Sequence, residues 1–200
     1  METTNKIYSK AEEMFMRYGV RSVTMDDLSR AIGISKKTLY QSVDNKEDLI
    51  NKVITFILTK ECDVMNIIQT KAKDAIEEVV MISRHVNKLL QSINPAAMYD
   101  LQKYYTRQFE LMRSLNDQMI YSIIRDNLDK GIKEGFYRDN FNPEIIAKLY
   151  VGQADLIIDT QIFPAKQYDL TNVHREFVMH HLYSITTEKG KERLEKIFKD

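Results

Sequence analysis

Apolar positions recur at helical spacing along almost the whole chain, and no segment shows the alternation of a strand. The pattern predicts an all-α protein. Helices are expected over about 4–18, in two short pieces within 22–43, from 46 past 62, over 72–93, from 96 toward 134 with a bend near 114–116, and over 143–160, 172–187 and a short stretch after 190.

Residues 22–49 carry the strongest local signals for helix ends. Thr24 is a candidate N-cap, and Asp27 stands three residues later, as in a capping box. Gly33 supplies the positive φ that ends a helix, and Ser35 is placed to cap the next one. The segment therefore predicts two short helices joined by a glycine turn.

The second short helix is predicted to have one buried and one polar face. Leu39 and Val43 lie four residues apart and are expected to point inward. The other face is left with Lys36, Lys37, Thr38, Tyr40 and Gln41. A helix-turn-helix places such a face in the major groove of DNA.

This run resembles the DNA-binding domain of the TetR family of bacterial repressors. The matching residues, in order and spacing, are Thr24, Leu28, Ser29, Gly33, Ile34, Ser35, Thr38, Leu39, Tyr40, Lys46, Glu47 and Leu49. The chain departs from the family pattern at Ser42 and Val43, where an aromatic pair is usual, and at Lys37, where a small residue is common. The resemblance implies a three-helix DNA-binding domain over 1–48, joined by a linking helix to a helical effector-binding and dimerisation domain over 49–200.

Charge adds a local footprint to a neutral chain. The chain has 29 basic and 29 acidic residues, whereas residues 29–46 hold four basic residues and one acidic residue, a local charge of +3. A short positive patch is typical of a protein that touches DNA at one end only.

Two kinds of DNA contact are predicted, with double-stranded operator DNA as the partner. Lys36, Lys37, Thr38 and Gln41 are candidates for base contacts. Thr24 and Lys46 begin helices, whose N-termini attract phosphate, and Tyr40 matches the family tyrosine that hydrogen-bonds phosphate. The alternatives are a solvated helix face, a Thr24 that only caps and a Lys46 that is only solvated.

The resemblance also implies that a small-molecule effector binds among the middle helices. The residues that we assign to this effector site are Tyr99, Lys103, Tyr104, Arg107, Met112, Met119 and Tyr121. Tyrosine and methionine side chains suit an apolar or aromatic molecule, and Lys103 and Arg107 could accept a single carboxylate. The alternative is that roughly half of this Tyr/Met-rich stretch is ordinary core.

Two helices near the C-terminus carry surplus apolar surface. The resemblance implies that they form a four-helix homodimer interface, assigned to Ile146, Tyr150, Ala154, Ile157, Phe177, His181 and Leu182. The alternative is burial within one subunit.

Several other classes of protein are disfavoured. The chain has no phosphate-binding glycine loop, nucleophile elbow or zinc-protease motif, so we expect no enzyme activity and no cofactor. The histidines form no metal-binding pair, and Cys62, the only cysteine, is expected to be half-buried and structural rather than a redox sensor. No membrane span or signal peptide is recognisable, which favours the cytoplasm.

The sequence therefore predicts a ligand-responsive DNA-binding transcriptional regulator. We expect a repressor that an apolar or aromatic effector releases from a palindromic operator. The alternative is a helical adaptor or enzyme that uses the helix-turn-helix fold without binding an operator.

Overall fold

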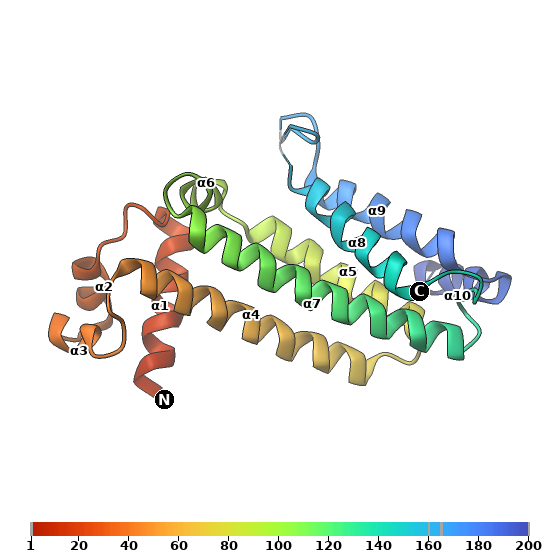
Figure 1. Ribbon diagram of the computed structural model, residues 1–200, viewed down its shortest axis with the longest axis horizontal. Helices are drawn as coiled ribbons and strands as arrows, with labels where there is room; N and C mark the ends of the chain where they lie inside the picture. The colour runs from red at the N-terminus through yellow and green to blue at the C-terminus, as the bar shows by residue number, and fades with distance from the viewer. Residues whose placement is uncertain (1, 160, 165, 200) are drawn as a thin grey trace. The chain divides into compact units, whose positions relative to one another are not determined.

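The computed structural model describes residues 2–159, 161–164 and 166–199, which form ten helices (Figure 1). They are α1 (Glu2–Tyr18), α2 (Met25–Ile32), α3 (Lys36–Tyr40), α4 (Lys46–Lys71), α5 (Ala75–Ser92), α6 (Pro95–Tyr104), α7 (Thr106–Lys133), α8 (Pro143–Ile157), α9 (Leu170–Ile185) and α10 (Glu188–Lys199). Among these described residues, β pairing is limited to one isolated antiparallel bridge between Tyr137 and Thr186. The predicted all-α class is confirmed.

The helices pack into two compact units. The first unit comprises Met1–Cys62 and Ile93–Asn116, and the second comprises Asp63–Ser92 and Asp117–Asp200. The core of the first unit joins apolar side chains of α1 to α4 with Ala97 and Leu101 of α6. The packing around the helix-turn-helix therefore extends beyond residue 48, and the division into functional domains at that position stays a prediction.

The second unit has its own core, built from α5, α8, α9, α10 and the later part of α7. A buried polar cluster lies at one end of it. The hydroxyl of Tyr137 shares its single proton between Asn127 Oδ1 at 3.0 Å and the carbonyl oxygen of Ala75 at 3.2 Å. The amide of Asn127 donates to the same carbonyl at 2.9 Å, so one peptide oxygen of α5 ties together α7 and the segment after it.

The predicted bend near 114–116 is wrong, because the break falls at Tyr105 instead. That residue has φ −131° and ψ 49°, outside the helical region, while residues 114–116 lie within α7. Its ring packs against the core of the first unit. No glycine or proline lies at the break, so the sequence carries no local signal for it.

Other helix ends differ by a few residues from those predicted. Residues 72–74 precede α5, α9 begins at Leu170, and α8 ends at Ile157, whereas residue 160 lies outside the described part. Gly131 and Gly190 lie inside helices. At Gly131 in α7 a Cβ would overlap the Tyr137 ring, and at Gly190 in α10 it would overlap the carbonyl oxygen of Phe136, so both permit close approach.

Three further features bear on the sequence-based expectations. Cys62 is exposed, so the half-buried structural cysteine predicted there is wrong. None of the described helices combines the length and the apolar character that crossing a membrane requires. Within the described residues, no group of three or more histidine, cysteine, aspartate or glutamate side chains could hold a metal ion.

Candidate nucleic-acid interface

The turn between α2 and α3 is built from the capping residues that the sequence predicted. Thr24 has extended backbone, its hydroxyl oxygen accepts the Asp27 amide at 3.1 Å, and Asp27 Oδ2 accepts the Thr24 amide at 3.1 Å. The Thr24 hydroxyl also donates to Asp27 Oδ2 at 2.6 Å, and this bond, followed by that of the Thr24 amide, lowers the pKa of Asp27. Gly33 has φ +76°, and Ser35 Oγ accepts the Thr38 amide at 3.0 Å. The capping box, the left-handed glycine and the second cap are confirmed.

Packing then separates the two faces of α3. The Leu39 side chain is completely buried, as is almost all of Val43, so both point into the core of the first unit as predicted. Tyr40 keeps 48% of its surface exposed, and Lys36, Lys37 and Gln41 are exposed as well. Thr38 is half-buried, and its hydroxyl lies 2.8 Å from that of Ser35. The predicted DNA-contact side chains of α3 thus line one accessible surface.

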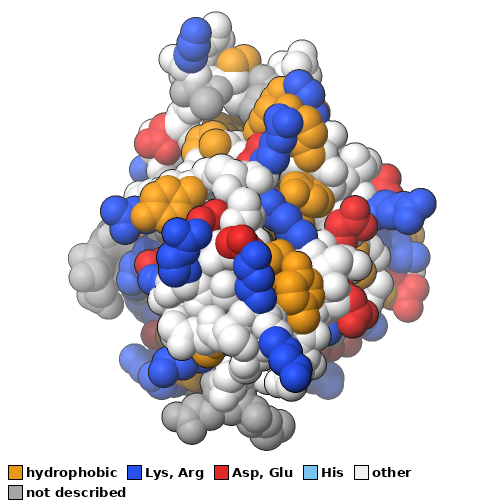
Figure 2. Space-filling view, turned by 90° about the vertical axis from the view of Figure 1, so that its left-hand side faces the viewer, with side chains coloured by type: hydrophobic (Ala, Val, Ile, Leu, Met, Phe, Trp, Pro, Cys, Tyr) orange, Lys and Arg blue, Asp and Glu red, His pale blue; other side chains and the backbone are white. Residues whose placement is uncertain are grey.

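Acidic residues of α2 moderate the positive charge of this surface. Lys36 Nζ lies 2.5 Å from Asp26 Oδ1, and an Arg30 guanidinium nitrogen lies 3.5 Å from Asp27 Oδ1. The predicted charge of +3 omitted these partners because they precede residue 29. All four side chains are largely exposed, so the pairs are weak and phosphate oxygens could compete for the two cations. Figure 2 shows Lys and Arg side chains spread over this end of the molecule.

Lys46, at the first position of α4, has a structural contact that the sequence did not reveal. Its ammonium group donates to the carbonyl oxygen of Arg21 at 2.9 Å and lies 5.6 Å from the centre of the Tyr105 ring. Burial lowers its pKa, although the nearby carboxylates of Asp100 and Asp27 act in the opposite direction. This hydrogen bond uses one of the three ammonium protons and leaves two that could bind a phosphate oxygen. The phosphate contact stays a prediction.

The predicted effector residues do not gather in one place. Tyr99 and Tyr104 are 52% and 43% exposed, and Lys103 and Arg107 are exposed as well. Met112 packs against the core of the first unit, and Tyr121 packs against that of the second. Met119 is half-buried in the second unit. Tyr99, Lys103 and Tyr104 thus lie on the surface, and the assignment of the seven residues to an effector stays a prediction.

Four of the seven predicted interface residues lie in the subunit core instead. Tyr150, Ile157, His181 and Leu182 are each at most 8% exposed. The Tyr150 ring centre lies 4.6 Å from that of Phe177 and 4.7 Å from that of His181. Ile146, Ala154 and Phe177 are half-buried. For these helices, the sequence pattern did not distinguish the inward apolar face from the outward one.

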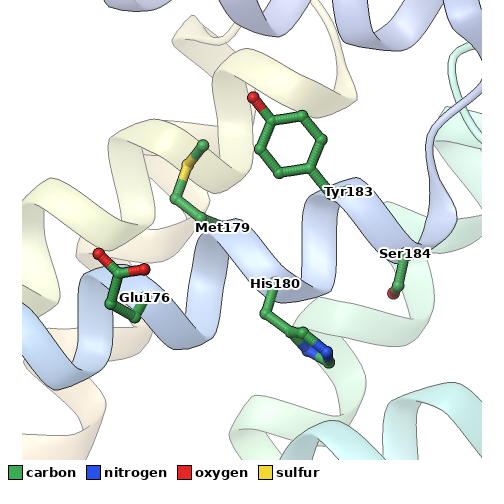
Figure 3. A pocket seen from close by; sticks show the side chains of 5 residues that line it. All are labelled: Glu176, Met179, His180, Tyr183 and Ser184. Atoms are coloured by element: carbon green, nitrogen blue, oxygen red, sulfur yellow. The ribbon is translucent and has the colours of Figure 1, made fainter.

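Both helices nevertheless expose large apolar side chains. Ile145, Leu149 and Leu156 of α8 are 56%, 55% and 45% exposed, and Tyr183 of α9 is 48% exposed. Figure 3 shows an open hollow along α9, lined by Glu176, Met179, His180, Tyr183 and Ser184. A face of this kind suits a partner surface.

Comparison with known proteins finds a matching family, related sequences and a similar fold. Residues 7–53 match the family described as bacterial regulatory proteins, tetR family. Over 82% of its length the chain is 24% identical to the uncharacterized HTH-type transcriptional regulator YvaF of Bacillus subtilis, covering 85% of that protein. It is 23% identical to the fatty acid metabolism regulator protein of the same organism, with 82% of this chain and 86% of that protein covered. The solved structure of the regulator FadR from Bacillus subtilis in complex with stearoyl-CoA superimposes with a TM-score of 0.66 at 16% identity, covering 88% of this chain and 96% of that one.

Proposed function

Because the chain belongs to the TetR family of bacterial transcriptional regulators, we propose that it is a repressor whose paired reading heads bind a palindromic operator and leave it when an apolar effector binds. The observation that carries the proposal is the capped helix-turn-helix. It buries Leu39 and Val43 and presents Lys37, Tyr40 and Gln41 to solvent on one surface.

We assign different tasks to the exposed side chains of this surface. Lys37 and Gln41 contact base edges, where an ammonium group suits guanine and a carboxamide suits adenine, and Lys36 and Thr38 lie beside them. Thr24, Tyr40 and Lys46 contact phosphates and set the register of the head on the duplex. Contacts to phosphate carry no base information, so the two groups differ in what their loss would do.

The exposed apolar face of α8 and α9 supports a homodimer. Its residues, Ile145, Leu149, Leu156 and Tyr183, replace the buried side chains as the candidates for the interface. A two-fold dimer presents two heads to two half-sites, which are expected about 34 Å or a multiple of it apart.

An apolar effector is supported by residue chemistry and by a relative. Met112, Met119 and Tyr121 are partly buried apolar side chains of α7. The relative named as a fatty acid metabolism regulator, and the similar structure that holds stearoyl-CoA, suggest a fatty acid or its coenzyme A thioester as the first compound to test. Such a ligand would raise the melting temperature of the protein and, as an inducer, lower its affinity for DNA.

The decisive experiment is DNA binding by the purified protein, using the region upstream of its own gene. Lys37→Ala and Gln41→Ala should change which operator variants bind best, whereas Tyr40→Phe should weaken binding to all of them about equally. Lys196→Gln, which removes an exposed charge from α10, is the control. If the unmodified protein binds specific and scrambled DNA alike, the protein is an adaptor rather than an operator-binding regulator.

A further inference from the structure

We propose that a surface formed by Arg21, Tyr99, Lys103 and Tyr104, here called the α6 ledge, binds the phosphate backbone of DNA outside the half-site that α3 contacts. This inference rests on the proposed function, because it extends the footprint of the same DNA-binding head. All four residues belong to the first packing unit, as do α2 and α3.

Arg21 is held at three points. Its amide donates to Asp100 Oδ2 at 2.8 Å, and its carbonyl oxygen accepts Lys46 Nζ at 2.9 Å. Its guanidinium carbon lies 4.3 Å from the centre of the Tyr104 ring. A guanidinium stacked on an aromatic face keeps its N–H edges available for phosphate oxygens. The exposed cation is therefore pre-positioned, so little conformational entropy remains to be lost on binding.

Lys103 is oriented in a similar way by two aromatic rings. Its ammonium group donates to the Tyr99 hydroxyl at 2.6 Å and lies 5.1 and 5.6 Å from the ring centres of Tyr99 and Tyr104. The two rings meet edge to face with centres 6.4 Å apart. Two cations are thus fixed on one exposed aromatic support.

Two arguments identify DNA as the occupant. The first is charge. The nearby carboxylate Asp100 is turned toward the Arg21 amide, so the exposed groups of the ledge are cationic and phenolic, which suits a polyanion. The second is continuity. Lys46, a proposed phosphate contact of the head, holds the carbonyl oxygen of Arg21, so the ledge begins where that contact ends.

The test compares a duplex that holds only the operator core with one extended by about one helical turn, about 10 base pairs, at each end. Affinity is measured by fluorescence anisotropy at several salt concentrations for the unmodified protein, Arg21→Ala, Lys103→Gln, Tyr104→Phe and the control Lys196→Gln. The unmodified protein should bind the extended duplex several-fold more tightly than the core. Arg21→Ala and Lys103→Gln should each remove part of that gain and lower the salt slope by about one. Tyr104→Phe keeps the ring and should keep the gain.

The possible failures separate from one another. If the protein binds neither duplex, the proposed function itself is overturned. If it binds the core but gains nothing from the extension, the ledge makes no flanking contact. Equal losses by Arg21→Ala on core and extended duplexes would place Arg21 within the half-site, against the proposal. If Arg21→Ala and Lys103→Gln bind both duplexes like the unmodified protein, the α6 ledge does not bind DNA and the proposal is overturned. The ledge would then suit an acidic protein instead.

Discussion

Two buried histidines should make the stability of this protein sensitive to mild acid. His174 and His181 lie one heptad apart on α9, each 6% exposed. His174 Nδ1 lies 2.8 Å from Asn87 Oδ1 of α5, whereas the buried Nε2 of His181 has no hydrogen-bond partner among the described residues. The pKa of each is lowered from 6.5 to about 4, in His174 by burial and in His181 by burial together with the charge of His180.

The size of the effect follows from these pKa values. In the unfolded chain both imidazoles take up protons near pH 6.5, whereas in the folded protein they do so only near pH 4. Their contribution to stability is therefore complete above pH 6.5 and is lost as the pH falls toward 4. One pKa unit is worth about 1.4 kcal/mol, so lowering the pH to about 5 should cost about 2 kcal/mol per histidine.

Substitution of His181 by phenylalanine should expose both consequences of its burial. A buried nitrogen without a hydrogen-bond partner destabilises the folded protein by about 1–3 kcal/mol, and the variant removes it. The phenylalanine keeps an aromatic ring against Tyr150. We expect His181→Phe to be more stable than the unmodified protein at neutral pH and to lose only about half as much stability at about pH 5.

The assay is urea unfolding followed by circular dichroism at several pH values and one fixed protein concentration. The neighbouring exposed residue supplies the control, because His180→Gln should keep nearly the whole acid sensitivity. If His181→Phe and the unmodified protein lose equal stability between about pH 7.5 and pH 5, His181 is not a buried neutral imidazole and the argument fails.

Three further outcomes are expected. Gly131→Ala should cost about 3 kcal/mol in urea unfolding, since the added methyl group overlaps the buried Tyr137 ring; an unchanged midpoint would mean that the ring can move. Thr24→Ala should cost about 1 kcal/mol and speed hydrogen exchange at the start of α2, whereas Thr24→Ser should not, and equal exchange in both would argue against the cap. Leu149→Glu should give folded monomers by sedimentation, because the side chain is 55% exposed in the subunit; a persistent dimer would place the interface elsewhere.

The sequence predicted those features that neighbouring residues determine. The capping box of Thr24 and Asp27, the turn at Gly33 and the inward side of Leu39 each depend on residues at most a few positions apart. Such signals are local hydrogen bonds and helical periodicity. They locate the exposed surface of α3, which we propose contacts DNA, without any knowledge of the rest of the fold.

The sequence could not predict which apolar face of α8 points inward. Tyr150 and Leu149 are neighbours in sequence, yet one is 8% exposed and the other 55% exposed. Both faces of the helix are apolar, so periodicity gives no preference, and the packing of Phe177 and His181 against Tyr150 decides the outcome. The charge near α3 was overestimated for a related reason, because Asp26 lies ten residues before Lys36 and meets it only after folding.

Gly19 carries a local signal and a tertiary one at the same position. Its φ of +83° is the left-handed conformation in which glycine commonly ends a helix, and α1 ends just before it. A Cβ at this position would also lie only 2.9 Å from Asp100 Oδ2, the atom that accepts the Arg21 amide. A larger residue would therefore strain the turn and push away the carboxylate that fixes Arg21. The glycine that marks the end of the first helix thus also makes room for α6, and only the folded arrangement reveals that the ledge beside the head depends on it.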